Sequence, residues 1–191
     1  MSFNDSYRGS PPWDIGRPQR EFVNLSEAGE VTGKVIDVGC GTGEQAIFLS
    51  SKGHPALGVD SAPLAIEKAM AKAKARRSDA RFLVADALDL GRVGGSFDTA
   101  VDCGLFHTFN DADRARYLSS LASVLPAGGK LFMLCFSDRE PGTWGPRRVS
   151  KTEILGAFGS GWRVNYLQAA RMETNLEQPE VRAYLTSATR L

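Results

Sequence analysis

Three glycines at alternate positions, Gly39, Gly41 and Gly43, follow a short apolar run at residues 35–38. Glycine adopts backbone dihedrals that a Cβ atom forbids, and it lets the chain pass close to a ligand. A helix is expected to begin at Glu44, and the unpaired N–H groups of its first turn would face the same ligand. The stretch therefore predicts a binding turn, although a glycine-rich strand-to-helix turn alone is also typical of α/β proteins in general.

Three later apolar stretches each end on an acid, and the carboxylates are Asp60, Asp86 and Asp102. Because the carboxyl ends of parallel strands meet at one edge of a sheet, we expect all three near the glycine turn. Asp60 ends the next strand after that turn, where a carboxylate can meet the two hydroxyls of a ribose. A row of uncompensated carboxylates would repel itself, so the pattern indicates a ligand.

The glycine spacing argues against a dinucleotide. A GxGxxG fingerprint needs a third glycine at position 44, where this chain has Glu44. An acid there would also oppose the positive end of the helix that a pyrophosphate needs. A Walker A pattern is absent from the sequence as well. The turn therefore suits a nucleoside that has no phosphates and carries a positive charge.

Strands and helices alternate along the chain. Strands are expected at residues 35–38, 55–60, 81–86, 97–102, 129–136, 162–170 and 184–189. Helices are expected at residues 20–28, 44–52, 61–74, 111–125 and 150–158. Alternation implies parallel pairing through right-handed crossovers. The fold prediction is α/β: a single Rossmann-like doubly wound domain, whose mostly parallel seven-stranded sheet ends in an antiparallel C-terminal strand pair.

Capping side chains mark several helix starts. Ser61 is expected to cap the helix that follows Asp60, and Asp111 is expected to cap the helix near the middle of the chain. Ser150 and Glu153 have the spacing of a capping box.

Composition excludes several classes of protein. The net charge is +1, from 23 basic and 22 acidic residues, so nothing calls for a polyanionic partner. The one basic run, Lys72 to Arg77, is interpreted as a solvated helix face rather than a nucleic-acid surface. The three cysteines lack CxxC spacing, which predicts a reducing compartment with no disulfide framework and no metal site. With no bilayer-length apolar run and no signal pattern, we expect a cytoplasmic protein.

The N-terminal segment is rich in proline and glycine, yet it contains Tyr7, Trp13 and Ile15. A disordered tail is expected to lack such residues. The segment is therefore expected to pack on the domain as a strap, either over a ligand or simply with Trp13 anchored on the core.

Four segments of the sequence resemble the motifs of a known family. VIDVGCGTG, the GVD ending at Asp60, VADAL around Asp86 and FDTAVDCGLFH are similar to the motifs of class I S-adenosylmethionine-dependent methyltransferases, from about Lys34 to Phe136. PPWDIGRPQ and the compact size resemble the branch of thiopurine, thiol, halide and heterocycle methyltransferases. The resemblance implies one domain, 1–191, divided into a strap and helix (1–28), a cofactor-binding core (29–136), and a loop, short helix and last two strands (137–191).

The resemblance also implies roles for individual residues. The backbone around Gly39 to Gly41 would hold the methionine moiety, Asp60 the ribose, and Asp86 with the Ala87 N–H the adenine. Asp102 and Cys103 would face the methyl group through their backbone, and Trp13 would close over the cofactor. The implied cofactor-binding set is Trp13, Asp37, Gly39, Cys40, Gly41, Thr42, Gly43, Asp60, Ser61, Asp86, Ala87, Asp102 and Cys103.

Methyl transfer from a sulfonium mainly requires alignment and exclusion of water. A base is needed only if the acceptor arrives protonated, and His107 is the candidate, with a hydrogen-bonding role in the pocket wall as the alternative. Tyr7, Phe106 and Trp144 are candidates for the acceptor pocket, and core packing is the alternative for each. The strand exit at residues 102–105 lacks the Asn/Asp-Pro-Pro-Tyr/Phe motif of enzymes that methylate bases or glutamine amides.

The predicted function is transfer of a methyl group from S-adenosyl-L-methionine, leaving S-adenosyl-L-homocysteine, to an O, N or S atom of a small acceptor. An aromatic or heterocyclic acceptor is expected, and nucleic acid and membrane partners are not. A nicotinamide-dependent reductase and a non-catalytic S-adenosylmethionine-binding sensor or scaffold are the alternatives. The sequence predicts neither the acceptor nor the oligomeric state.

Overall fold

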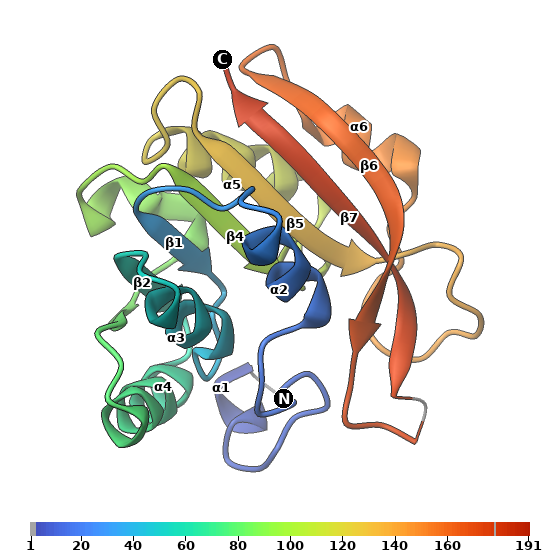
Figure 1. The fold of residues 1–191 in the computed structure, drawn as a ribbon. Helices are drawn as coiled ribbons and strands as arrows, with labels where there is room; N and C mark the ends of the chain where they lie inside the picture. The colour runs from blue at the N-terminus through green and yellow to red at the C-terminus, as the bar shows by residue number, and fades with distance from the viewer. Residues whose placement is uncertain (1–2, 178) are drawn as a thin grey trace.

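A seven-stranded sheet of order β3-β2-β1-β4-β5-β7-β6 forms the centre of the molecule in the computed structural model, which describes residues 3–177 and 179–191 (Figure 1). The strands are β1 (Val35–Val38), β2 (Ala56–Asp60), β3 (Arg81–Val84), β4 (Thr99–Cys103), β5 (Lys130–Phe136), β6 (Trp162–Glu173) and β7 (Glu180–Arg190). β1 to β5 pair in parallel, whereas β7 is antiparallel to both β5 and β6. The predicted fold class is confirmed.

Helices cover both faces of this sheet (Figure 1). The α-helices are α1 (Phe3–Ser6), α2 (Arg20–Glu27), α3 (Glu44–Ser51), α4 (Pro63–Arg76), α5 (Asp111–Ala122) and α6 (Lys151–Ala157), and two 3-10 helices are η1 (Ala87–Val93) and η2 (Phe106–Thr108). None of the described helices combines the length and the apolar character that crossing a membrane requires.

Alternation along β5 divides the core into two layers. Leu131 and Met133 belong to the cluster that contains Tyr117 of α5, whereas Phe132 and Leu134 belong to the cluster that contains Phe22 of α2. Successive side chains of a strand point to opposite faces, so one strand supplies both layers. β5 is buried almost throughout, as expected for a strand of a parallel sheet with both faces covered.

The order of the strands fixes where a ligand can bind. From β1 the chain proceeds outward to β2 and β3, and then returns to place β4 on the other side of β1. The crossovers on the two sides of this point diverge, which leaves a crevice at the carboxyl ends of β1 and β4. The glycine turn follows β1, so the fold places it in this crevice.

Some local expectations need correction. α4 has Ala62 rather than Ser61 at its N-cap, with no side-chain cap, because Asp60 accepts the Ala62 N–H at 2.8 Å. α5 is capped by Asn110, not Asp111, through the Asp113 N–H. The capping box of Ser150 and Glu153 is confirmed.

Strand ends differ from the prediction as well. β3 ends at Val84, so Asp86 lies beyond the strand and caps η1 instead. β4 continues to Cys103 and leaves Asp102 inside the strand. β6 and β7 are longer than predicted, because they form a long hairpin ladder from Trp162 paired with Arg190 to Glu173 paired with Glu180, with one register shift between Val164 and Tyr166.

Candidate active site

A cavity of about 580 Å³ opens at the carboxyl ends of the strands. We call one part of its lining the carboxylate end, formed by Gly39, Gly41, Asp60, Asp86 and Ala87. We call another part the aromatic end, formed by Gly104, His107, Phe136, Trp144 and Met172. Strap residues around Trp13 also line the cavity. The structure thus brings the turn, two of the predicted carboxylates and the strap together.

The glycine turn requires glycine for steric reasons. Gly39 has φ +71°, and a Cβ atom there would lie 2.9 Å from the Leu105 side chain. Gly43 has φ +84°, and a Cβ atom there would lie 2.6 Å from the Phe82 ring. Gly39 lines the cavity, whereas Gly43 is not among the lining residues. Gly43 therefore serves close packing of the turn on β3.

The backbone N–H groups of residues 39–41 already donate hydrogen bonds within the protein. The N–H groups of Gly39 and Cys40 donate to the Val59 carbonyl at 2.8 and 2.9 Å, and the Gly41 N–H donates to Asp60 at 2.9 Å. These three N–H groups are therefore not available to a ligand. Oxygen acceptors dominate the carboxylate end instead, which suits an ammonium group and hydroxyls rather than a phosphate.

Asp60 is held in a fixed orientation at the carboxylate end. Its Oδ2 accepts the Gly41 N–H and its Oδ1 accepts the Ala62 N–H. Burial raises the pKa of this carboxyl, while hydrogen bonds from the backbone oppose that rise. Asp86 is similarly oriented, because its Oδ1 accepts the Leu88 N–H at 2.9 Å. Each carboxylate keeps further lone pairs for a ligand in the cavity.

Two predicted acids lie outside the cavity lining. Asp37 accepts the Ala46 N–H at 3.1 Å and so joins β1 to α3, and burial raises its pKa to about 8. Asp102 accepts the Leu105 N–H at 2.8 Å and the Tyr117 hydroxyl at 2.9 Å. Burial raises the pKa of Asp102 to about 7. Both carboxyls therefore bind groups of the protein beneath the cavity lining. Cys103, by contrast, is a lining residue.

An ion-pair network joins the strap to the glycine turn and to the start of α3. Lys72 contacts Glu44 at 2.6 Å, Asp14 of the strap at 3.9 Å, and the Thr42 hydroxyl at 2.6 Å. The Thr42 hydroxyl in turn donates to Asp14 at 2.7 Å, and Arg76 pairs with Glu44 at 2.7 Å. Lys72 and Arg76 therefore do not form a purely solvated face. Glu44, neutralised in this way, no longer argues by its charge against a pyrophosphate, although the third glycine is still missing.

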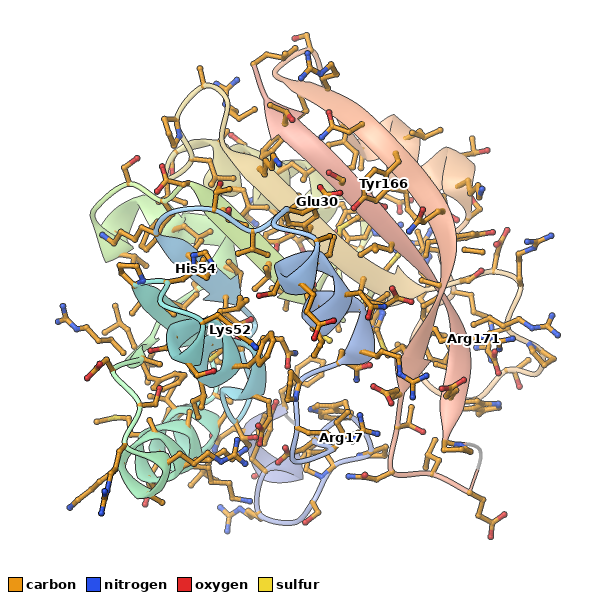
Figure 2. All side chains as sticks on the ribbon, in the orientation of Figure 1. Arg17, Glu30, Lys52, His54, Tyr166 and Arg171 are labelled. Atoms are coloured by element: carbon orange, nitrogen blue, oxygen red, sulfur yellow. The ribbon has the colours of Figure 1, made fainter. Side chains whose placement is uncertain are left out.

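A second set of contacts fastens the strap to the end of β6. Glu173 accepts the Arg20 N–H at 3.0 Å and pairs with Arg17 at 2.9 Å, and its backbone exchanges two hydrogen bonds with the Gln19 side chain. Arg17 is labelled beside the strap in Figure 2, whereas His54 lies just before β2, where its ring contacts the Gly33 carbonyl. Sequence analysis missed Glu173, since no local pattern connects residues so far apart.

The strap carries two aromatic residues over the carboxylate end. The Trp13 Nε1–H donates to the Tyr7 hydroxyl at 3.1 Å. Tyr7 is 5% exposed, packs on Ala62 and Ala65, and has its hydroxyl 2.9 Å from where a Cβ of Gly41 would lie. Tyr7 thus lies above the turn and not at the aromatic end, where Trp144 lies. Trp13 is 44% exposed and is one of the residues that line the cavity.

His107 has one ring nitrogen permanently occupied. The backbone N–H of Phe136 donates to its Nδ1 at 3.0 Å, so the proton of the neutral ring is on Nε2. Burial and the charge of Arg114 lower the pKa of His107 to about 4. This geometry opposes the role of general base, because the unprotonated nitrogen is engaged and the free one carries a proton.

Phe106 lies in the core and not in the acceptor part of the cavity. It is fully buried within the core cluster and is not among the cavity-lining residues. The guanidinium of Arg114 lies 5.0 Å from its ring centroid. Phe136, which the sequence analysis did not select, takes its place: its ring packs edge-on against both His107 and Trp144, at 5.8 and 5.6 Å.

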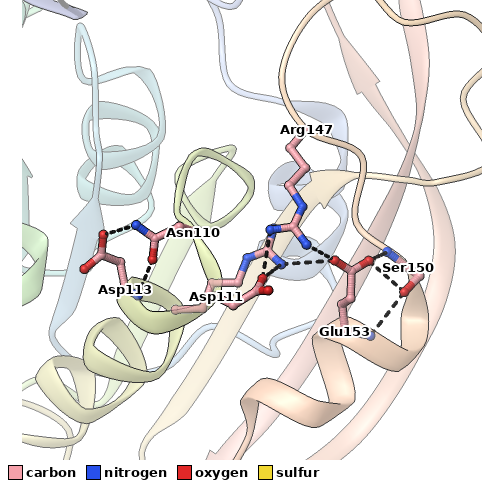
Figure 3. A network of polar contacts seen from close by, with 7 residues as sticks. Asn110, Asp111, Asp113, Arg147, Ser150 and Glu153 are labelled. Carbon is pink, nitrogen blue, oxygen red and sulfur yellow. Dashed lines mark hydrogen bonds and ion pairs between the residues drawn. The ribbon is translucent and has the colours of Figure 1, made fainter.

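The loop that carries Trp144 is fixed to α5 and α6. Arg147 pairs with Asp111 at 2.8 Å and also with Glu153, whose carboxylate accepts the Ser150 N–H (Figure 3). Arg148 donates to the Trp144 carbonyl at 2.8 Å. The loop therefore holds the aromatic end in a defined shape.

Comparison with known proteins agrees with this architecture. Residues 35–129 match the family model described as a methyltransferase domain. The 2-heptyl-1-hydroxyquinolin-4(1H)-one methyltransferase of Mycobacteroides abscessus is 35% identical over an alignment of 184 residues that covers 91% of this chain and 81% of the relative. A probable thiol methyltransferase of Arabidopsis thaliana is 26% identical over 76% of this chain and 65% of its own length.

One solved structure is similar over nearly the whole chain. It comes from work on the conversion of a disulfide bond into a thioacetal group during echinomycin biosynthesis, and it matches with a TM-score of 0.92 and 33% identity. The match covers 98% of this chain and 90% of that one. This chain therefore belongs to the class I S-adenosylmethionine-dependent methyltransferases. As an enzyme of this family it uses S-adenosylmethionine as its cofactor.

Proposed function

We propose that this enzyme transfers the methyl group of S-adenosylmethionine to an oxygen, nitrogen or sulfur atom of a small, flat, aromatic or heterocyclic acceptor. The observation that carries the proposal is the lining of the cavity, which has oxygen acceptors at one end and aromatic rings at the other. The first end suits a positively charged nucleoside, and the second suits a flat aromatic ring.

We assign the cofactor to the carboxylate end. Asp60 would accept the two ribose hydroxyls, and Asp86 with the Ala87 N–H would bind the adenine. The carbonyl oxygens of the glycine turn would bind the ammonium group of the methionine moiety, since the N–H groups at residues 39–41 are taken within the protein. Trp13 would cover the nucleoside, because the strap that carries it is fastened on both sides of the cavity.

The acceptor would lie at the aromatic end, between the strap and the loop at residues 137–148. Phe136, Trp144 and Met172 supply apolar walls there. Small acceptors are supported by the names of the relatives, which refer to a hydroxyquinolone and to a thiol. Nucleic acid is not expected as the acceptor, since the cavity is enclosed by the strap and the net charge is only +1.

The bound cofactor supplies an activated methyl group on a sulfonium. The task of the chain is to align the acceptor with that group and to keep water out, and alignment can lower the barrier by several kcal/mol, up to about 7–11 kcal/mol in favourable cases. Membership in this family sets aside the alternative of a nicotinamide-dependent reductase. It also favours a catalyst over a non-catalytic sensor or scaffold.

The test uses S-adenosylmethionine carrying a deuterated methyl group and a panel of phenols, N-hydroxy heterocycles, thiols and heterocyclic amines. Mass spectrometry should detect transfer of the label to at least one class of small ring acceptor. A variant with Trp144→Ala should lower turnover of ring acceptors and leave cofactor affinity within about twofold. If the panel gives no labelled product although the cofactor binds, the proposed acceptor class is wrong.

A further inference from the structure

The Cε1–Nε2 edge of the His107 ring faces Gly104 at the aromatic end of the cavity. A Cβ atom at Gly104 would lie 3.2 Å from its Cε1 and 3.6 Å from its Nε2, so this edge of the ring faces the backbone that follows Cys103. Both Gly104 and His107 line the cavity. This is where the exit of β4 meets the aromatic end, and under the proposed function the transferred methyl group lies there.

The tautomer of this ring is fixed by the backbone. A backbone N–H can only donate, so Nδ1 of His107 must accept from Phe136 and the neutral ring carries its proton on Nε2. The pKa of about 4, which burial and Arg114 produce, keeps the ring neutral at physiological pH. His107 is therefore a hydrogen-bond donor toward the cavity and not a proton acceptor.

A buried positive charge lies close to the His107 ring. Arg114 of α5 has a side chain only 3% exposed, and its Nε and Nη2 have no hydrogen-bond partner among the described residues. Its ion pairs with Asp111 and Glu153 are long, at 3.3 and 3.4 Å. The positive potential of Arg114 therefore extends to His107, whose pKa it lowers.

The other titratable groups around His107 do not supply a base. The carboxylate of Asp102 on β4 is engaged by backbone N–H groups and by the Tyr117 hydroxyl. Burial raises the thiol pKa of Cys103 on β4 and of Cys135 on β5. These thiols stay protonated at neutral pH, so neither of them accepts a proton readily.

The acids that line the cavity are engaged elsewhere. Asp14 and Glu44 pair with Lys72, and Asp60 and Asp86 lie at the carboxylate end, where each accepts backbone N–H groups. No lining residue that the structure describes thus offers an unoccupied basic nitrogen or carboxylate at the aromatic end.

We propose, on the basis of the proposed function above, that the acceptor enters as a preformed anion, and that the Nε2–H of His107 donates a hydrogen bond to its charged atom. The chemical class is an aromatic or heteroaromatic ring with an acidic hydroxyl. Burying an anion is costly unless a donor meets it, and a charge-assisted hydrogen bond meets that cost.

The transfer step then balances without a base. A lone pair of the acceptor oxyanion forms the bond to the methyl carbon while the carbon–sulfur bond breaks, and its electron pair stays on sulfur. The products are a neutral methyl ether and a neutral thioether, and no proton is released in this step. His107 keeps its proton throughout and acts by positioning the oxyanion.

The first test measures kcat/KM against pH for phenols of graded acidity, from nitrophenols to unsubstituted phenol. We expect the midpoint of each profile to follow the ionisation of that phenol, with a plateau above it. A midpoint that stays the same for all phenols would show that a group of the enzyme takes the proton, and it would overturn the proposal.

The second test uses two variants that separate the two nitrogens. His107→Asn places an amide oxygen where Nδ1 accepts the Phe136 N–H, and it lacks the Nε2 donor. His107→Gln can extend a donor to the position of Nε2. We expect kcat/KM for phenolates to fall about tenfold to hundredfold in His107→Asn, with recovery of part of that loss in His107→Gln. Melting temperature and cofactor affinity serve as controls for folding.

A binding experiment separates this proposal from the proposed function, because it needs no turnover. With S-adenosylhomocysteine present, 4-nitrophenolate and its neutral methyl ether are titrated into the wild type and the His107→Asn variant. The variant should bind the phenolate about tenfold or more weakly and the ether equally well. Equal losses for both ligands, or no loss for either, would contradict a donor role for His107.

Discussion

Lys72 of α4 and Glu44 of α3 form a 2.6 Å ion pair in which the side chains are only 20% and 7% exposed. The same ammonium lies 2.6 Å from the Thr42 hydroxyl and 3.9 Å from Asp14 of the strap. The Lys72 ammonium therefore connects the glycine turn, the first turn of α3 and the strap. Ion pairs at exposed positions contribute little to stability, but this one is largely removed from solvent.

Replacing Lys72 with Met should reduce both stability and cofactor affinity. Glu44 would keep Arg76 but lose its shortest contact, so we expect the free energy of unfolding to fall by about 1–3 kcal/mol. The affinity for S-adenosylmethionine should fall because Asp14 loses its contact with Lys72 and holds the strap only through the Thr42 hydroxyl. Denaturant unfolding and calorimetry measure the two effects. Arg92→Ala, which breaks an exposed pair with Asp89, is the control and should change stability by less than about 1 kcal/mol. Equal effects in the two variants would show that the pair is unimportant.

Arg147→Ala should affect the acceptor and spare the cofactor. The variant loses the pairs to Asp111 and Glu153 that fix the loop at residues 137–148, so Trp144 loses its defined place. We expect KM for the acceptor to rise several-fold. Steady-state kinetics with both substrates varied measures this.

Arg116→Ala is the matched control, since Arg116 lies on α5 and pairs with Asp113, outside the loop. It should leave both KM values unchanged. If Arg147→Ala raised the KM for S-adenosylmethionine instead, the loop would belong to the cofactor end of the cavity.

Buried Asp37 makes stability depend on pH. Its folded-state pKa of about 8 is above the ordinary value of 3.8, so the folded state binds the proton more tightly than the unfolded state does. The contribution of Asp37 to the free energy of unfolding is present at low pH and is lost as the pH rises through its folded-state pKa of about 8. Between pH 7 and 8.5 the free energy of unfolding should therefore fall, by up to about 1.4 kcal/mol per pH unit from this group.

Asp37→Asn should reduce that slope, because an amide does not titrate and still accepts the Ala46 N–H. Denaturant unfolding of both proteins at several pH values measures the slope. His107 does not interfere in this range, because both its folded-state pKa of about 4 and its ordinary value of 6.5 lie below it. A slope that is identical in wild type and variant would show that Asp37 is not the group responsible.

The sequence predicted those features that depend on local chain geometry. Glycine spacing, apolar runs and terminal acids place the turn and Asp60 at one sheet edge, because parallel strands bring their carboxyl ends together. Aromatic residues in a proline-rich segment correctly indicated that Tyr7 packs on the domain, and Trp13 contacts the ring of Tyr7.

Contacts between distant segments were beyond prediction. Glu173 fastens the strap from a strand near the end of the chain, and nothing near it in sequence marks that role. Phe106 and Phe136 are equally apolar, and only the packing of η2 against β5 decides that Phe106 enters the core while Phe136 lines the cavity. The role of His107 likewise depends on a backbone N–H from β5.

The central claim is that the carboxylate end binds S-adenosylmethionine through Asp60. Calorimetric titration of the wild type, Asp60→Asn and Asp60→Ala with S-adenosylmethionine tests it, with circular dichroism to verify the fold. The account predicts binding to the wild type and at least about tenfold weaker binding to Asp60→Ala, since a charged hydrogen-bonding group contributes about 1.5–3 kcal/mol. Asp60→Asn should lie between the two. Equal affinity of all three proteins, or no binding by the wild type, would contradict the account.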